Sequence, residues 1–160
     1  MLAALDVIQD QFLAELGIDR VTALLSFNLA PLCSRRDISM LGLIQRSVTG
    51  RGPAHFSAFF QRRGGSTARA TRATHTAHSR QLVDVRRPAY SEQVRRSAVG
   101  LIPVYNLLPE QVVSLPEVSA FQGDLQNMLK SAAAADCPSW WMLLSPRIPM
   151  YMHPLRVLSR

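Results

Sequence analysis

The sequence predicts a mainly α-helical protein: one small, irregular domain of about four to five helices. Three observations support this fold class. Apolar residues recur at helical spacing over much of the chain, Gly or Pro follows most of these stretches, and alternating strand-like patterns are nearly absent. With 160 residues and an apolar fraction of 48%, the chain is long enough to bury the core of a single domain.

Residues 1–60 are expected to form the N-terminal helices. The first helix carries an apolar stripe at helical spacing, which consists of Leu2, Leu5, Ile8, Phe12 and Leu16. Gly17 is typical of the residue that follows a helix, because glycine adopts the left-handed conformation of such stops readily. Asp19 is expected to cap the N-terminus of a second helix that ends near Pro31.

A third helix is predicted before Gly50. Ser34 and Asp37 have the spacing of a capping box, and the apolar positions after them are Ile38, Leu41, Ile44 and Val48. The following PAHFSAFF predicts a short helical piece. We expect its three aromatic side chains, Phe56, Phe59 and Phe60, to anchor it in the core.

Residues 61–80 are predicted to be a disordered basic loop. This segment contains no large apolar residue and is rich in Gly, Ser, Thr, Ala and Arg, so burial cannot offset the entropy of ordering it. The next five residues, QLVDV, are short and apolar enough to predict one brief strand.

Residues 81–136 are expected to combine a short extended segment with a C-terminal helix that packs on the first part. Pro103 forbids a central strand or a helix interior at its position, and a short helical turn is predicted after Pro109. Ser114 and Glu117 repeat the capping-box spacing, with Pro116 in the first turn. The helix after them is expected to run to about residue 135, with an apolar stripe made of Val118, Phe121, Leu125, Met128 and Leu129.

Residues 137–160 predict an irregular C-terminal tail. The segment is rich in Pro and Trp and shows no helical period, so we expect Trp140 and Trp141 to hold it against the domain. All four segments are interpreted as one domain overall.

The charge of the chain is high and uneven. The formal net charge is +7, and only Lys130 among the 18 basic residues is lysine. Residues 46–96 hold eleven arginines against two acidic residues, while the segments on either side are nearly neutral. Arginine presents a planar fork that matches phosphate, which makes a polyanionic partner a reasonable hypothesis. GC-rich coding sequence would also favour Arg over Lys, and that alternative stays open.

Four arginine pairs, at 35–36, 62–63, 86–87 and 95–96, are the clearest signal for a binding site. Arginines bind phosphates through charge and paired hydrogen bonds, largely regardless of base sequence. The predicted nucleic-acid-binding residues are Arg35, Arg36, Arg46, Arg86, Arg87, Arg95 and Arg96. The competing interpretation is a solvated charged surface with no ligand.

The sequence shows no set of residues suited to catalysis, so the chain is not predicted to be an enzyme. It lacks a Walker phosphate loop, a Gly-x-Ser-x-Gly elbow and a carboxylate pair suited to acid–base chemistry. His75 and His78 in THTAH are interpreted as solvated residues of the loop rather than metal ligands, and Asp37 as a helix cap rather than a base. We therefore expect no cofactor, no metal and no small-molecule substrate.

The N-terminus and the cysteines indicate an intracellular protein, nuclear or cytoplasmic. The apolar N-terminal segment carries acidic residues and no basic region before them, unlike a secretory signal. No apolar run reaches the eighteen residues of a membrane span. Cys33 and Cys137 lack metal-ligand spacing and are expected to be free thiols.

One long stretch resembles a known family. RRSAVGLIPVYNLLPEQVVSLPEVSAFQGDLQNML, residues 95–129, is similar to the segment that follows the polymerase in non-LTR (LINE-type) retrotransposon polyproteins. The matching positions are Arg96, Val104, Tyr105, Asn106, Leu108, Pro109, Val112, Val113, Val118, Phe121 and Leu125. The upstream APLCSRRDISMLGLIQRSVTGRGP resembles the helix and turn that precede this segment in the same proteins. Tyr105 stands where the family more commonly has Trp.

The resemblance implies a detached, non-catalytic C-terminal region of a reverse transcriptase. The family's polymerase chemistry needs paired aspartates in a Tyr-x-Asp-Asp hairpin, which this sequence lacks. The implied role is an accessory region that contacts RNA or DNA phosphates nonspecifically through arginines. The alternative is a functionless fragment of a decayed element, whose apolar face normally docks on a polymerase domain.

Most of this stretch is expected to build the fold rather than the site. Its structural residues are Tyr105, Asn106, Leu108, Pro109, Val112, Val113 and Phe121. We expect Tyr105, Leu108, Val112 and Phe121 to pack in the core. Asn106 is expected to bond the backbone of the turn that leads to Pro109, as Asn commonly does.

Overall fold

The mainly helical prediction is confirmed by the computed structural model, which describes residues 2–63, 78–84 and 92–158. Four described helices have eight or more residues: α1 (Leu2–Glu15), α2 (Arg20–Phe27), α3 (Leu32–Val48) and α7 (Val118–Ala134). The shorter α-helices are α4 (Glu92–Arg95), α5 (Ile102–Tyr105), α6 (Glu110–Val113) and α8 (Leu155–Leu158). Four 3-10 turns complete them: η1 (Ala54–Phe56), η3 (Ala98–Leu101), η4 (Trp140–Met142) and η5 (Met150–Met152).

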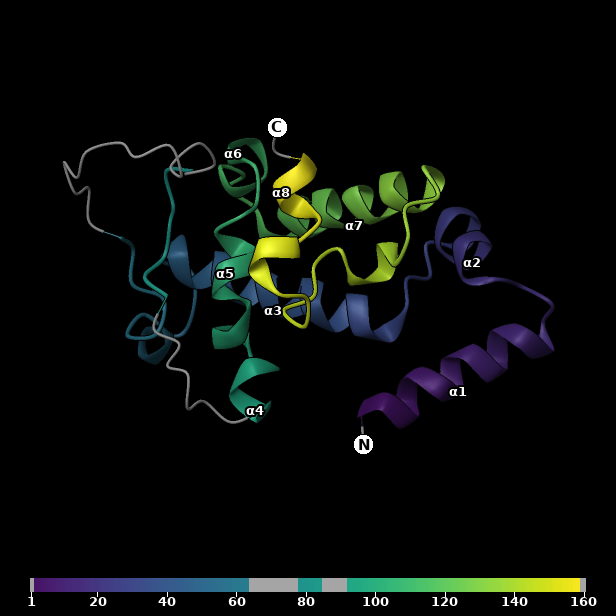
Figure 1. The fold of residues 1–160 in the computed structure, drawn as a ribbon. Helices are drawn as coiled ribbons and strands as arrows, with labels where there is room; N and C mark the ends of the chain where they lie inside the picture. The colour runs from purple at the N-terminus through teal and green to yellow at the C-terminus, as the bar shows by residue number, and fades with distance from the viewer. Residues whose placement is uncertain (1, 64–77, 85–91, 159–160) are drawn as a thin grey trace.

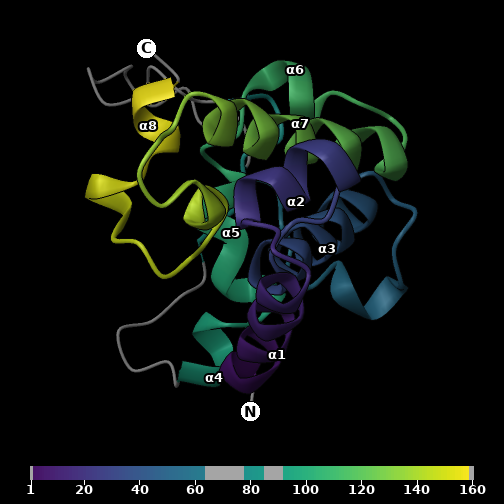
Figure 2. The same cartoon turned by 90° about the vertical axis from the view of Figure 1, so that its right-hand side faces the viewer.

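The centre of the molecule is the packing of α3 against α7 (Figure 1). The apolar stripes predicted for both helices are buried here, with Leu41, Phe121 and Leu125 fully enclosed. The two helices approach closely at Gly42, where a Cβ atom would lie 2.4 Å from the Gln122 side-chain nitrogen. α2 contacts both α1 and α7 (Figure 2).

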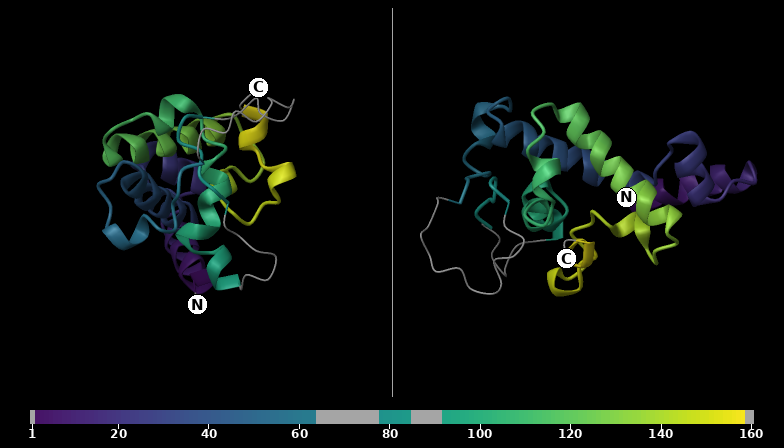
Figure 3. Two further views of the ribbon diagram at one scale, coloured as in Figure 1. Left: turned by 90° about the vertical axis from the view of Figure 1, so that its left-hand side faces the viewer. Right: turned by 90° about the horizontal axis from the view of Figure 1, so that it is seen from above.

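α1 lies at one end of the molecule and projects beyond the α3–α7 core (Figures 1 and 3). Its predicted stop is confirmed, since Gly17 has φ +66° just after the helix. The predicted cap is also confirmed, because the Asp19 carboxylate accepts hydrogen bonds from the backbone nitrogens of Val21 and Thr22 at 2.7 and 2.9 Å.

Both predicted capping boxes are wrong. α3 begins at Leu32, so Ser34 already lies in its first turn, where its hydroxyl donates to the Trp141 carbonyl oxygen at 2.7 Å. α7 begins at Val118 with Glu117 as its cap residue and no side-chain cap bond. Pro31 occupies the cap position of α3, three residues before Ser34, and Glu117 occupies that of α7, three residues after Ser114. Neither serine is therefore placed to cap its helix.

A buried polar pair joins α3 to the segment around α5 and α6. The Tyr105 hydroxyl donates to the Gln45 side-chain oxygen at 2.7 Å. The Gln45 side-chain nitrogen donates to the carbonyl oxygens of Val113 and Leu115, at 3.0 and 2.8 Å. The core placement predicted for Tyr105, Leu108, Val112 and Phe121 is confirmed.

The two ends of the predicted disordered loop are held by the domain. Arg62 and Leu82 form an isolated antiparallel bridge, which is the only strand-like pairing among residues 2–63, 78–84 and 92–158. His78, predicted to be solvated, is buried instead and lies edge-on to the Tyr105 ring. Residues 64–77, including His75, lie outside the described residues.

Asn106 bonds a distant segment rather than its own turn. Its side-chain oxygen accepts from the Leu82 backbone nitrogen at 2.8 Å, and its side-chain nitrogen donates to the Leu82 carbonyl oxygen at 2.9 Å. The prediction of a local turn bond is therefore wrong. The Asn106 side chain instead pairs with the Leu82 backbone through both a donor and an acceptor, as a neighbouring strand would.

The tail is irregular as predicted and packs through short turns. Trp140, Leu143, Leu144 and Leu155 are buried, and the Arg20 guanidinium lies 5.5 Å from the Trp141 ring centre. Of the three anchors predicted in 53–60, Phe60 is buried and Phe56 packs partly, whereas Phe59 is half exposed. Phe59 is therefore not a core anchor.

Candidate nucleic-acid interface

Four arginines gather around one open groove of about 510 Å³ on the first half of α3. We call it the arginine groove; it is lined by Leu32, Arg35, Arg36, Asp37, Ser39, Met40, Arg96, Pro146 and Arg147. Three separate segments build it: α3, the residue after α4, and the loop that precedes η5. The tail reaches α3 because Ser34 holds the Trp141 carbonyl oxygen.

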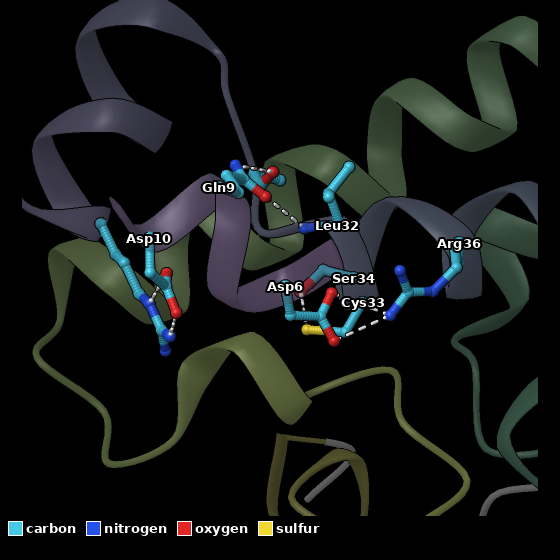
Figure 4. A network of polar contacts seen from close by, with 9 residues as sticks. Asp6, Gln9, Asp10, Leu32, Cys33, Ser34 and Arg36 are labelled. Atoms are coloured by element: carbon cyan, nitrogen blue, oxygen red, sulfur yellow. Dashed lines mark hydrogen bonds and ion pairs between the residues drawn. The ribbon is translucent and has the colours of Figure 1, made fainter. Parts of the chain in front are cut away.

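One of these arginines is tied to α1. The Arg36 guanidinium contacts both carboxylate oxygens of Asp6, at 2.9 and 3.0 Å, with both side chains about one-quarter exposed (Figure 4). The same face of α1 places Gln9 against the start of α3, where its side-chain oxygen accepts from the Leu32 backbone nitrogen at 2.7 Å. Arg36 therefore fixes α1 to α3 as well as lining the groove.

Asp37 is the acidic member of the arginine groove. Burial raises the pKa of its carboxyl to about 7, against the opposing effect of the nearby Arg147 and Arg36 guanidiniums. A carboxyl with that pKa is protonated about half of the time at neutral pH, so it weakens the positive field of the groove only in part. The predicted role of Asp37 as a helix cap is wrong, because α3 begins five residues earlier.

A second groove of about 450 Å³ adjoins the first, because Arg35 and Ser39 line both. It lies between α3 and α7, and we call it the amide groove; its other lining residues are Asn28, Ile38, Gln122, Gly123, Gln126, Asn127 and Lys130. Among the described residues that line the two grooves, Asp37 is the only acid. Together they form a basic track that continues into a row of side-chain amides.

The structure brings some of the predicted site residues together and separates others. Arg35, Arg36 and Arg96 line the arginine groove. Arg46 is exposed on α3 about three turns beyond Arg35, and Arg95 is exposed at the end of α4 without lining either groove. The other two predicted residues, Arg86 and Arg87, lie outside the described part of the chain.

Sequence reasoning missed Arg147 and Lys130. Neither belongs to an arginine pair, and both lie in segments whose net charge is near zero. The sequence distinguishes these two residues only weakly. Lys130 is the one lysine of the chain, and Arg147 lies between Pro146 and Pro149.

Histidines and metal ligands contribute nothing to this surface. The His78 Nε2 atom lies 3.0 Å from the Tyr105 carbonyl oxygen and its Nδ1 accepts from the Arg80 backbone nitrogen, so it is a neutral, structural residue whose pKa burial lowers. His153 is buried in the same way against the Ser145 carbonyl oxygen. No group of three or more potential metal ligands occurs in 2–63, 78–84 and 92–158.

α1 presents an uncovered apolar stripe, formed by Leu5, Ile8, Phe12 and Leu16. Each of these side chains is exposed by between 45% and 59%. α1 attaches to the body through its neighbouring face, which carries Asp6, Gln9 and the buried Leu13. The helix is therefore confirmed where it was predicted, but its apolar stripe is not the side that the core covers. Within the described ranges, no helix is long and apolar enough to cross a membrane.

Comparison of the chain with protein-family models, curated proteins and solved structures finds no match.

Proposed function

We propose that this chain is a non-catalytic accessory region that holds the phosphate backbone of RNA or DNA along its two adjoining grooves. One observation carries the proposal: Arg35, Arg36, Arg96 and Arg147, from three segments of the chain, line a single groove. Guanidinium forks bind phosphate oxygens in pairs and give affinity that depends little on base sequence.

The amide groove extends the same track toward Lys130. Its side chains, such as Gln122, Gln126 and Asn127, offer both donors and acceptors to the sugars and bases of a strand. A strand that enters at the arginines would thus pass from charge contacts to neutral hydrogen-bonding groups.

The proposed origin is the region that follows the polymerase in LINE-type retrotransposon polyproteins. The ordered set of residues from Arg96 to Leu125 supports it, and several of its apolar members lie in the core. In intact proteins of that type this region is expected to help hold template RNA or target DNA, which agrees with a phosphate-binding surface.

Binding of a labelled single-stranded RNA and a duplex DNA, measured at about 50 and 200 mM salt, tests this function. We expect affinity to fall steeply with salt, and the double variant Arg35→Ala/Arg147→Ala to bind at least about tenfold more weakly than the parent. Arg51→Ala is the matched control, because Arg51 pairs with Glu117 and lines neither groove. Absence of binding at 50 mM salt, or equal binding by the double variant, would contradict the proposal.

A second candidate function is docking on a polymerase domain through the exposed stripe of α1. Four large apolar side chains in water on one helix face are typical of a protein interface. Titration with the polymerase domain of a LINE-type element, read by sedimentation, tests this candidate. The double variant Phe12→Ser/Leu16→Ser should abolish complex formation, and absence of a complex with the parent would exclude the candidate.

A further inference from the structure

The arginine groove concentrates more positive charge than one internal phosphate of a strand requires. An internal phosphodiester carries a single negative charge and two free oxygens, whereas four guanidiniums line this groove. A terminal phosphomonoester carries a charge between −1.5 and −2 at neutral pH and presents three strong acceptor oxygens. Its charge and its acceptors match the groove better than those of a diester do.

The shape of the groove also suits one end group. Its volume of about 510 Å³ falls within the range of small-ligand sites, which is roughly 300 to 1,000 Å³. Leu32, Met40 and Pro146 contribute apolar side chains to its lining, from α3 and from the loop before η5, and a sugar or base can pack against them. The lining of the groove thus combines guanidiniums with apolar side chains, as a site for a single nucleotide needs.

Asp6 and Asp37 are the described carboxyls that act on these guanidiniums. Asp6 engages Arg36 in the ion pair with α1, so Arg36 shares its donors between Asp6 and the groove. Asp37 has a pKa of about 7, so its protonated form adds one more hydrogen-bond donor toward a phosphate oxygen. Arg35 and Arg147 add two further guanidiniums to the lining of the groove, beside Arg96.

We infer that the arginine groove recognises the terminal phosphomonoester of a nucleic-acid strand and seats the end nucleotide against its apolar walls. The inference rests on the proposed function and deepens it, because it assigns the end of the strand to this groove. The rest of the strand then follows the amide groove past Arg35 toward Lys130, through the residues that the two grooves share.

The test compares three versions of one single-stranded oligonucleotide: with a 5′-phosphate, with a 3′-phosphate, and with hydroxyls at both ends. Fluorescence anisotropy with the full chain at about 150 mM salt should show one phosphorylated form binding about tenfold more tightly than the hydroxyl form. The identity of the tighter form distinguishes the two possible ends. Arg147→Ala should remove the preference, whereas Lys130→Ala, as the matched control in the amide groove, should weaken all three forms equally.

Competition separates the end group from the strand. A nucleoside monophosphate in excess should displace the phosphorylated oligonucleotide, and the nucleoside without phosphate should not. Displacement by both or by neither would contradict a phosphate seat in the groove.

The two proposals fail in different ways. Equal, salt-sensitive binding of all three oligonucleotides would overturn the terminal-phosphate inference and leave strand binding intact. Absence of binding by every form would overturn the proposed function and the inference with it. A preference that persists in Arg147→Ala would place the end group outside the arginine groove and also overturn the inference.

Discussion

At the scale of single residues, Asp37 is under opposing electrostatic influences. Burial disfavours its charged form, while Arg147 and Arg36 favour it, and burial dominates. Its pKa in the folded chain is therefore about 7, well above the ordinary value of 3.8. The unfolded chain loses this proton at lower pH, so ionisation of Asp37 favours the unfolded state.

Replacement of Asp37 by Asn should therefore stabilise the protein at high pH. As the pH rises from about 4 to about 7, the unfolded state releases the Asp37 proton first, and the stability of the parent falls relative to the variant. Above pH 7 the difference should level off, with the variant more stable by about 1 kcal/mol or more. Urea unfolding at pH 5 and pH 8 measures it, and Glu15→Gln controls for the loss of one exposed carboxylate. A difference that shrinks with rising pH would show that Asp37 is stabilised as a carboxylate.

The hydroxyl of Tyr105 provides a second prediction at this scale. Tyr105→Phe keeps the ring in the core but leaves the buried Gln45 side-chain oxygen without its donor. An unsatisfied buried acceptor costs about 1–3 kcal/mol, so the free energy of unfolding of the variant should be lower by that amount. The midpoint of denaturant unfolding should then fall. Tyr151→Phe, at a side chain that is 77% exposed, should leave the midpoint unchanged. Equal midpoints for Tyr105→Phe and the parent would mean that water or another group satisfies Gln45.

Sequence reasoning at this scale succeeded where a residue's chemistry alone decides its place. A large aromatic such as Phe121 or Tyr105, in an apolar segment, is buried in most folds, and both are buried here. Asn106 and His78 were misplaced because their partners depend on tertiary structure. The Leu82 backbone lies 24 residues from Asn106, and no local pattern indicates that bond.

At the scale of elements, the tight turn between α4 and η3 sets the position of Arg96. Gly100 is buried in η3, and a Cβ atom built on it would lie 1.9 Å from the Arg95 carbonyl oxygen at the end of α4. Since a backbone atom cannot move aside as a side chain can, only glycine fits without displacing the end of α4. Gly123 on α7 is the opposite case, because nothing lies within 4 Å of its Cβ position.

Alanine at these two glycines should have effects of opposite sign. Gly100→Ala should destabilise the protein by roughly 2 kcal/mol or more, because overpacking forces the backbone apart. Gly123→Ala should stabilise it by about 0.5–1 kcal/mol, because alanine loses less entropy than glycine in a helix interior. Thermal unfolding of the two variants beside the parent measures both shifts. A stabilising effect of Gly100→Ala would contradict the close contact there, and a destabilising effect of Gly123→Ala would contradict the open space at Gly123.

The extents of the long helices and the buried faces of α3 and α7 could be predicted from the sequence, but the buried face of α1 could not. Periodicity placed α1, α3 and α7 within a few residues, because Gly and Pro mark their ends. In α3 and α7 the apolar stripe faces the core. α1 departs from this rule because Gln9 and Asp6 bond to the start of α3 and turn the stripe to the solvent. Such polar attachments depend on groups that lie 20 or more residues away.

At the scale of the whole molecule, the basic surface does not coincide with the basic segment of the sequence. Residues 46–96 hold most of the arginines, yet of the five basic residues that line the two grooves in the described part of the chain, only Arg96 comes from that segment. The others come from α3, α7 and the tail. Counting charges along the chain therefore predicted a polyanionic partner, while the path of the backbone decides which arginines share a surface.

The number of phosphate contacts made by this surface can be obtained from how steeply the binding affinity falls with salt concentration. If the five basic residues of the two grooves engage a single strand, the logarithm of affinity should fall with the logarithm of salt concentration at a slope of about −3 to −4. Arg35→Ala should reduce the magnitude of that slope by about 0.7, because one counterion fewer is released. Arg46→Ala should leave the slope unchanged, since Arg46 lies about 16 Å along α3 from Arg35 and lines neither groove. A slope that responds equally to both variants would mean that the strand follows the length of α3 instead of the grooves.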